Sequence, residues 1–342
     1  MKTIVSIALF VFSLWFFAAC GGNNPSPEQE NAPEQSNKED VSLKRLDSLN
    51  RAIVSDSLNP ELYKERSQYF FDQKDVVSAG KDIEKAISLD SLNPRLYVQY
   101  AKILFAENRL QKGVIALQRA LELDNNDMDA LMLMAEVSFL AGKQEDMLKY
   151  IDKGMKVNKL DPRPYYLRGM FWLTKKDTAL AIKNFQQANF IDEDFAKAYV
   201  QLGLIYAARK NDMAIDYFNS AINAEPDNPD FYYALAMYYQ NTGREEKAHL
   251  VYDQIVKKHP HYAKAYYNKG FLYLTRDNEY EKAVEYFSLA IEQNPRYAKA
   301  YYNRALSYLA AGDTSAAIQD LQRTLDINPG HEWAKEKLQE LQ

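Results

Sequence analysis

Residues 229–262 read PDFYYALAMYYQNTGREEKAHLVYDQIVKKHPHY, and the residues on either side repeat this pattern. Outward from this stretch, the sequence realigns with itself about every 34 residues. The copies are 60–93, 94–127, 128–161, 162–195, 196–228, 229–262, 263–297 and 298–331. The fifth copy is one residue shorter than this period and the seventh is one residue longer. We expect both changes in the turn between two helices, where insertions and deletions cost little.

Three positions in the first half of each copy share one helical face. Position four is aromatic in seven copies, position eight is always small, and position eleven is large in seven copies. Steps of four and three residues place side chains on the same side of a helix. A small residue between two large ones leaves room for a side chain from the adjacent helix. The residues at position eight are Ser67, Ala101, Ala135, Gly169, Gly203, Ala236, Gly270 and Ala305.

This pattern resembles the tetratricopeptide repeat, and the resemblance covers residues 60–331. It implies an all-α fold, an α-solenoid of eight tandem helical hairpins wound into a right-handed superhelix, with the first helices on the concave side. Residues 42–59 are expected to form the second helix of a partial copy. Residues 332–342 are expected to form a closing cap helix, because a terminal repeat has no neighbour to cover its apolar face.

The N-terminus has the pattern of an export signal. Met1-Lys2 precedes a short apolar run that ends in Phe17-Ala18-Ala19-Cys20, and this predicts a signal peptide over 1–19. The run and its cysteine resemble the bacterial lipobox, which implies a palmitate-containing lipid on Cys20. The lipobox prefers leucine three residues before the cysteine, where this sequence has Phe17. The alternative is an ordinary signal peptide cut nearby, which would leave a free thiol.

Residues 20–41 are rich in proline and polar residues, with almost no apolar side chain. Such a segment buries too little surface to fold, so we expect a disordered tether between the lipid and the repeats. Gly21 follows the cysteine instead of an acidic residue. In Gram-negative lipoproteins this favours the outer membrane, and we expect a lipid-anchored protein that faces the periplasm.

The resemblance also implies where a partner would bind, because positions two, five and nine of each first helix face the concave groove. From the fourth copy onward, positions five and nine form an apolar and aromatic strip, which is typical of a binding surface. The alternative is that position nine packs between neighbouring helices. The residues of the strip are Tyr166, Met170, Val200, Leu204, Tyr233, Met237, Tyr267, Phe271, Tyr302 and Leu306.

Position two adds a basic rim to this predicted groove. Its residues are Arg163, Lys197, Lys264 and Lys299, with one acidic exception, Asp230. A partner segment with apolar anchors and flanking acidic residues would complement such a surface.

Some members of the family hold a C-terminal carboxylate with a clamp of lysine, arginine and asparagine side chains. Asn268, Lys299 and Asn303 match parts of this clamp. Tyr233 and Met237 stand where the clamp needs lysine and asparagine, and Arg304 is one position late. The clamp is therefore not predicted.

Catalytic and metal-binding patterns are not found in the sequence. The histidines have no second ligand at helical spacing, and there is no nucleophile elbow, phosphate loop or second cysteine. A net charge of −5 with scattered lysine and arginine does not suggest nucleic-acid binding. The four histidines are His249, His259, His261 and His331.

The sequence therefore predicts a protein that is not an enzyme, requires no cofactor or metal, and binds other proteins or peptides. The leading hypothesis is a scaffold or adaptor tethered to the bacterial cell envelope, with components of an envelope complex as partners. The alternative is an accessory factor that recruits an envelope hydrolase or protease to its substrate.

Overall fold

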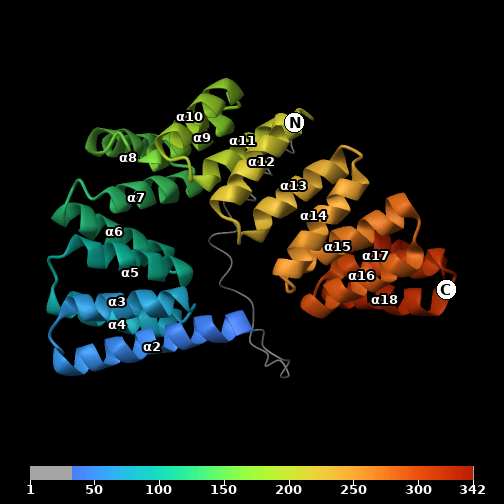
Figure 1. Ribbon diagram of the computed structural model, residues 1–342, viewed down its shortest axis with the longest axis horizontal. Helices are drawn as coiled ribbons and strands as arrows, with labels where there is room; N and C mark the ends of the chain where they lie inside the picture. Colours follow the sequence, from blue (N-terminus) through green and yellow to red (C-terminus); the bar gives the residue numbers. More distant parts are fainter. Residues whose placement is uncertain (1–32, 342) are drawn as a thin grey trace. The chain divides into compact units, whose positions relative to one another are not determined.

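The computed structural model describes residues 33–341, and within this range every regular element is a helix (Figure 1). The helices fall into two compact units, one ending at Ile191 and the other beginning at Asp192. In each unit, helices adjacent in the chain pack in antiparallel pairs, and each pair contacts the next. The predicted all-α class, built from stacked helical hairpins, is confirmed.

The first helices of four copies start in the same way. They have proline at the first position, where its fixed φ is suited to a helix and its missing N–H is not needed. Asparagine or aspartate comes before each of these prolines and caps the helix; Asn59 Oδ1, for example, accepts the Glu61 N–H at 3.1 Å. The first helices are α3 (Pro60–Asp72), α5 (Pro94–Ala106), α7 (Met128–Leu140), α9 (Pro162–Thr174), α11 (Ala196–Ala208), α13 (Pro229–Asn241), α15 (Ala263–Leu272) and α17 (Ala298–Ala310).

The second helix of each copy packs back on the first. Its buried face repeats small and large residues, as in Ala79, Ile83 and Ala86 of the first copy, all of them fully buried. The second helices are α4 (Val76–Leu89), α6 (Leu110–Leu123), α8 (Gln144–Val157), α10 (Thr178–Ile191), α12 (Met213–Ala224), α14 (Glu245–Lys258), α16 (Tyr280–Gln293) and α18 (Thr314–Ile327).

Position eight is small because a large side chain from the second helix lies against it. In three copies the small residue is glycine and the large one is phenylalanine. A Cβ placed on Gly203 would lie 2.5 Å from Cε1 of Phe218, and one on Gly169 would lie 2.5 Å from Cε1 of Phe185. The close packing of these three hairpins therefore depends on a residue without a side chain at position eight.

The aromatic residue at position four holds the turn that leads into its helix. The tyrosine hydroxyl donates to the backbone carbonyl six residues earlier, which fixes the connection between successive copies. These bonds join Tyr63 to Ser57, Tyr97 to Ser91, Tyr165 to Lys159, Tyr232 to Pro226 and Tyr301 to Pro295, at 3.0–3.4 Å.

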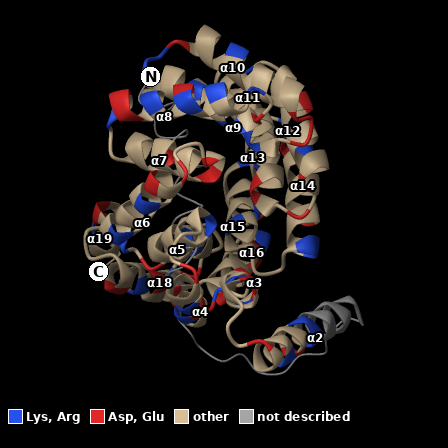
Figure 2. Ribbon diagram, turned by 90° about the vertical axis from the view of Figure 1, so that its left-hand side faces the viewer, with Lys and Arg blue, Asp and Glu red and all other residues tan. Residues whose placement is uncertain are grey.

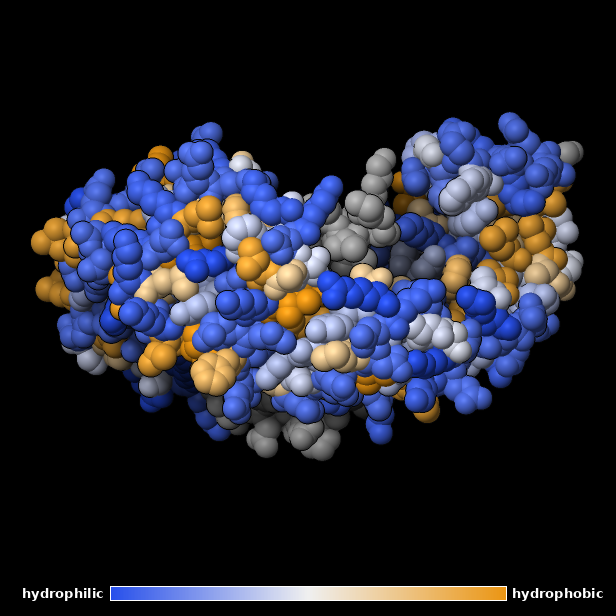
Figure 3. Space-filling model, turned by 90° about the horizontal axis from the view of Figure 1, so that it is seen from above, coloured by the Kyte–Doolittle hydropathy of each residue, from blue (hydrophilic) through white to orange (hydrophobic). Residues whose placement is uncertain are grey.

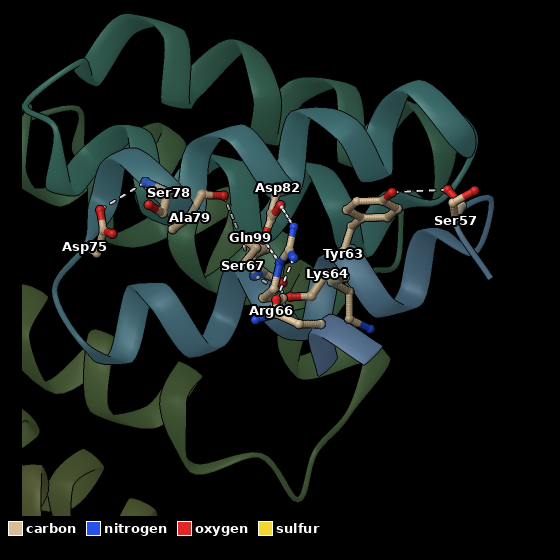
Figure 4. A network of polar contacts seen from close by, with 11 residues as sticks. Ser57, Tyr63, Lys64, Arg66, Ser67, Asp75, Ser78, Ala79, Asp82 and Gln99 are labelled. Atoms are coloured by element: carbon tan, nitrogen blue, oxygen red, sulfur yellow. Dashed lines mark hydrogen bonds and ion pairs between the residues drawn. The ribbon is translucent and has the colours of Figure 1, made fainter. Parts of the chain in front are cut away.

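In five copies, position seven carries a polar side chain that bonds to the side chain sixteen residues earlier, in the helix before its own. Arg66 makes the most bonds: it donates one hydrogen bond of 2.8 Å to Asn50. It also donates two of 2.7 Å to Asp82, in the second helix of its own copy (Figure 4). In four other copies the position-seven residue donates to the side chain sixteen residues earlier. These pairs are Tyr100–Glu84, Arg168–Asp152, Lys269–Asp253 and Arg304–Ser288.

A residue in the left-handed conformation follows the end of each first helix. Three of these residues are glycine, which adopts positive φ readily. The other five have a Cβ, which makes this backbone conformation less favourable. They are Lys74, Asn108, Gly142, Lys176, Lys210, Gly243, Asn278 and Gly312, with φ between 53° and 90°.

The two length changes are located by these left-handed residues. In the seventh copy the extra residue lies before Asn278, inside the first helix, where Tyr273–Asp277 form a π-helical turn. The expectation that this insertion lies in the turn is therefore wrong, since one added residue is accommodated by widening the last helical turn. In the fifth copy the missing residue follows Lys210, and α12 has 12 residues instead of 14.

Replacing Lys74, Lys176 and Lys210 by glycine is expected to stabilise the protein. A left-handed residue other than glycine costs about 1 kcal/mol or more. We therefore expect each change to raise the free energy of unfolding by up to about 1 kcal/mol. Part of this gain is lost because glycine makes the unfolded chain more flexible. Thermal unfolding of the triple variant should shift to higher temperature. The same substitution at Lys81, inside α4, should destabilise by about 1 kcal/mol; equal effects at both kinds of site would contradict this explanation.

The two ends of the described chain are covered by single helices. Helix α2 (Pro33–Ser55) packs on α3 and buries Leu49 and Ile53. It begins at Pro33, before the predicted partial repeat, so the end of the segment predicted to be disordered is helical here. Extending an existing helix costs far less than nucleating one, which accounts for this difference. At the other end, α19 (Glu332–Glu340) buries Ala334 against the last copy.

Residues 1–32 lie outside the described part of the chain. The predicted signal peptide, Cys20 and the first part of the predicted tether all fall there. Within 33–341, no helix is long and apolar enough to cross a membrane.

Candidate peptide-binding face

Part of the predicted strip is buried. Tyr166 is 5%, Met170 1% and Val200 3% exposed. The Tyr166 ring packs on Phe185, with the ring centroids 5.8 Å apart. The prediction that these three residues belong to an exposed strip is therefore wrong, because position five of the fourth and fifth copies and position nine of the fourth are used for packing.

The remaining residues of the strip lie in the second unit and are half-buried. They keep part of each side chain accessible while the rest packs on the helices. These residues are Leu204, Tyr233, Met237, Tyr267, Phe271, Tyr302 and Leu306. The accessible aromatic part of the strip is thus confined to copies six to eight.

Tyr233, Tyr267 and Tyr302 occupy position five of three successive copies, and we call them the tyrosine row. The first two are held by asparagine from the next copy: Asn268 Nδ2 donates to the Tyr233 hydroxyl at 2.9 Å, and Asn303 Nδ2 donates to the Tyr267 hydroxyl at 2.8 Å. Both asparagines are buried, at 6% and 9% exposure. Because the amides are fixed by packing, the tyrosine rings have little freedom to move.

A second ring supports each residue of the row. The supporting ring belongs to the N-cap of the following helix: Tyr262 for α15, Tyr297 for α17 and His331 for α19. The ring centroids are separated by 5.9 Å for Tyr233–Tyr262, 4.9 Å for Tyr267–Tyr297 and 4.7 Å for Tyr302–His331. The row is therefore a pre-formed aromatic surface.

The tyrosine row is uncharged at ordinary pH. Burial raises the pKa of Tyr233, Tyr267 and Tyr302 above the usual tyrosine value, since the phenolate would lose its hydration. The same cause raises the pKa of the supporting Tyr262 and Tyr297. The hydroxyl groups stay protonated and can both donate and accept hydrogen bonds.

The predicted basic rim is only partly available to a partner. Arg163 is engaged within the chain, at 2.6 Å from Asp161 and 2.5 Å from Asp129. Lys197 and Lys264 are half-buried, while Lys299 is exposed. Lys264 Nζ lies 5.9 Å from the centroid of Tyr233 and 5.6 Å from that of Tyr262. Lys264 and Lys299 are therefore the rim cations that belong to the same copies as the row.

The residues of the partial carboxylate clamp have structural roles. Asn268 and Asn303 hold the tyrosine row, and Arg304 donates two hydrogen bonds to Asp320, at 2.7 and 2.9 Å. The supporting rings at Tyr262, Tyr297 and His331 were not predicted, although a ring directly before each helix is visible in the sequence.

Three of the histidines have partners of their own. His249 Nε2 lies 3.0 Å from Asp277 Oδ2, His261 Nδ1 lies 2.8 Å from Gln293 Oε1, and His331 Nδ1 accepts the Ala334 N–H. Among residues 33–341, no group of three or more potential ligands could hold a metal ion.

Charges and hydrophobic groups are mixed over the described surface. Lysine and arginine alternate with aspartate and glutamate along the helices (Figure 2). On the face drawn in Figure 3, hydrophobic side chains form small patches between hydrophilic ones.

Sequence profiles described as "Tetratricopeptide repeat" match four segments, residues 94–127, 196–228, 217–249 and 271–332. Protein bimA of Emericella nidulans is 28% identical over 107 residues, which are 31% of this chain. The match spans only 13% of the length of that relative.

Solved structures share the fold at low identity. The Cut9–Hcn1 hetero-tetramer of the APC/C is 16% identical, covering 87% of this chain and 58% of that chain, with a TM-score of 0.55. The human IFIT1 dimer with m7Gppp-AAAA is 16% identical, covering 83% and 77%, with a TM-score of 0.55. The C-terminal part of a repeat protein from Cytophaga hutchinsonii is 19% identical, covering 70% and 99%, with a TM-score of 0.54.

These structural likenesses concern the fold. The matching profiles show that the chain is built of tetratricopeptide repeats.

Proposed function

We propose that this protein is a non-catalytic adaptor that binds an extended segment of a partner polypeptide over the tyrosine row. Tetratricopeptide repeats are protein-interaction scaffolds. The observation that carries the proposal is the row itself, three half-buried tyrosines in successive copies, two held by buried asparagines and all three by a supporting ring. Rings that are fixed before binding lose little entropy when a partner docks.

The chemistry of the face favours one kind of segment. Neutral tyrosines next to Met237, Phe271 and Leu306 suit apolar or aromatic anchors. Lys264 and Lys299 would pair with acidic residues that flank those anchors, and such rim pairs affect the rate of association and its salt dependence. The partner is therefore a polypeptide segment with apolar anchors and flanking aspartate or glutamate.

The membrane attachment is part of the proposal and rests on the N-terminal sequence. We place a lipid on Cys20 and the repeats on the periplasmic side of the outer membrane. Labelling of growing cells with a palmitate analogue should mark the wild-type protein and not a Cys20→Ser variant. Label on both proteins, or on neither, would contradict a lipid at this residue.

The binding face is tested by reversing the charge of its rim. The partner is first captured from detergent-solubilised membranes, identified by mass spectrometry and purified. A Lys264→Glu/Lys299→Glu variant should bind it at least tenfold more weakly, and wild-type binding should weaken as salt is added. Lys112→Glu/Lys257→Glu is the matched control, because it makes the same charge change at exposed lysines of second helices.

A loss of affinity confined to the Lys264→Glu/Lys299→Glu variant would support the proposed face. Equal loss of affinity in both double variants would show a non-specific charge effect and would contradict the proposed face. The identity of the captured partner then decides the role of the adaptor. Components of an envelope complex would support a scaffold, whereas a hydrolase or protease would support recruitment of that enzyme.

A further inference from the structure

The first unit contains a pocket that the proposed function does not use. It has a volume of about 530 Å³ and is lined by residues of α8, α9 and α10. Tyr165 and Trp172 of α9 contribute its aromatic surface, and Arg168, Lys183 and Asn184 contribute polar groups. All of these residues belong to the first unit, whereas the tyrosine row belongs to the second.

In two other copies, the chain fills the equivalent space with a tyrosine of its own. Tyr217 stacks on Tyr206, with ring centroids 5.4 Å apart and an interplanar angle of 23°. Tyr286 stacks on Tyr273 in the same way, at 5.3 Å and 24°. In each case a ring from the second helix covers the aromatic residue at position eleven of the first helix.

The fourth copy lacks this ring. Tyr217 and Tyr286 directly precede the buried Phe218 and Phe287, and the residue that directly precedes the buried Phe185 is Asn184. The amide of Asn184 donates to the Leu180 carbonyl at 2.7 Å, so this side chain is bonded to its own helix. The pocket is the space that a tyrosine ring occupies in copies five and seven.

A cation accompanies the ring in one of those copies. Lys269, at position seven of the seventh copy, lies with Nζ 4.5 Å from the centroid of Tyr286. The residue at position seven of the fourth copy is Arg168, which lines the pocket and is paired with the exposed Asp152 at 2.7 Å. An aromatic ring in the pocket would therefore meet a cation as well as an aromatic face, and both contacts are favourable.

We infer that this pocket binds an aromatic side chain, tyrosine above all, from a polypeptide partner. The ring takes the place that Tyr217 and Tyr286 take in their own copies, stacked on Trp172 and next to Arg168. The lining carries two cations, Arg168 and Lys183, and one carboxylate, Asp152. The excess of positive charge favours acidic residues on either side of the aromatic anchor.

The test uses the peptide acetyl-Asp-Tyr-Asp-amide as the probe and the full chain as the receptor. Saturation-transfer NMR detects the tyrosine ring in contact with the protein, and quenching of Trp172 in a Trp15→Phe/Trp333→Phe background gives the affinity. Saturable binding is expected. Acetyl-Asp-Ala-Asp-amide should not bind, and acetyl-Lys-Tyr-Lys-amide should bind at least threefold more weakly.

Filling the pocket from within should abolish this binding. Asn184→Tyr introduces the residue found at this place in copies five and seven, and it should reduce saturation transfer to the peptide at least tenfold while the circular dichroism stays unchanged. Gln186→Tyr is the matched control, because it places the same ring on an exposed position of α10, and it should bind like the wild type. Trp172→Ala gives a second way to remove the site.

Two results would overturn the inference. One is the absence of saturable binding to the wild type, and the other is unchanged binding in both Asn184→Tyr and Trp172→Ala. Neither result bears on the tyrosine row, because the charge-reversal test of the row uses residues of the second unit.

Discussion

Replacing Gly203 by alanine is expected to lower the free energy of unfolding of the second unit by up to about 2 kcal/mol. In an exposed helix interior the same change would stabilise by about 1 kcal/mol. Here the added Cβ would lie 2.5 Å from the Phe218 ring. Overpacking of this kind costs about 1–3 kcal/mol, so the clash outweighs the gain in helix propensity.

A second substitution should restore the stability. Two copies use alanine with leucine at these positions, in the pairs Ala101–Leu117 and Ala305–Leu321, and all four residues are almost fully buried. Gly203→Ala/Phe218→Leu should therefore be less destabilised than the sum of the two single changes, by at least about 1 kcal/mol. Urea unfolding of the four proteins measures this coupling. Additive single effects would contradict the proposed pairing of position eight with the second helix.

Replacing Arg66 by alanine should destabilise the first copy by about 3–5 kcal/mol. The Asp82 side chain is only 9% exposed and receives two hydrogen bonds from Arg66 (Figure 4). Removal of the arginine leaves a buried carboxylate without its cation, which is a severe penalty. Hydrogen exchange of the amides in α3 and α4 should speed up accordingly, because a repeat stack can open locally.

The fourth copy offers the control for this effect. Arg168 also stands at position seven, but the side chain of its partner Asp152 is 59% exposed. Exposed pairs contribute about 1 kcal/mol or less, so Arg168→Ala should have a correspondingly small effect. Similar losses in the two variants would show that burial of the carboxylate is not the cause.

The sequence predicted the helix pairs well because their determinants are local or periodic. Proline after asparagine or aspartate marks the start of a helix at Pro60, Pro94, Pro162 and Pro229. The small residue at position eight indicates that the two helices of a copy approach closely, as they do at Gly203. The proline occurs in four copies and the small residue at position eight in all eight, so one irregular position does not hide the pattern.

Other features could not be predicted because they depend on three-dimensional neighbours. The left-handed conformation of Lys74, Lys176 and Lys210 has no signal in the residue type, since lysine is common elsewhere in helices. The inserted residue of the seventh copy could lie in a turn or in a helix, and the π-helical turn at Tyr273–Asp277 resolves this.

The exposure of the apolar strip was predicted only in part. Positions five and nine were correctly singled out as apolar, but their exposure depends on what the neighbouring helices place over them. Tyr166 and Met170 are buried, whereas Tyr267 keeps part of its ring accessible. The bonds from Asn268 and Asn303 to the tyrosine row link residues 35 and 36 positions apart, which a single-copy pattern does not reveal.

Site-specific photocross-linking tests the central claim, that the tyrosine row binds the partner, most directly. The photoreactive residue p-benzoylphenylalanine is placed at Phe271, beside the row, and in a second protein at Leu250, an exposed residue of the second helix α14. Irradiation in intact cells should join the partner to the protein labelled at 271 and not to the one labelled at 250. Cross-links to the partner from 250 and none from 271 would contradict the account.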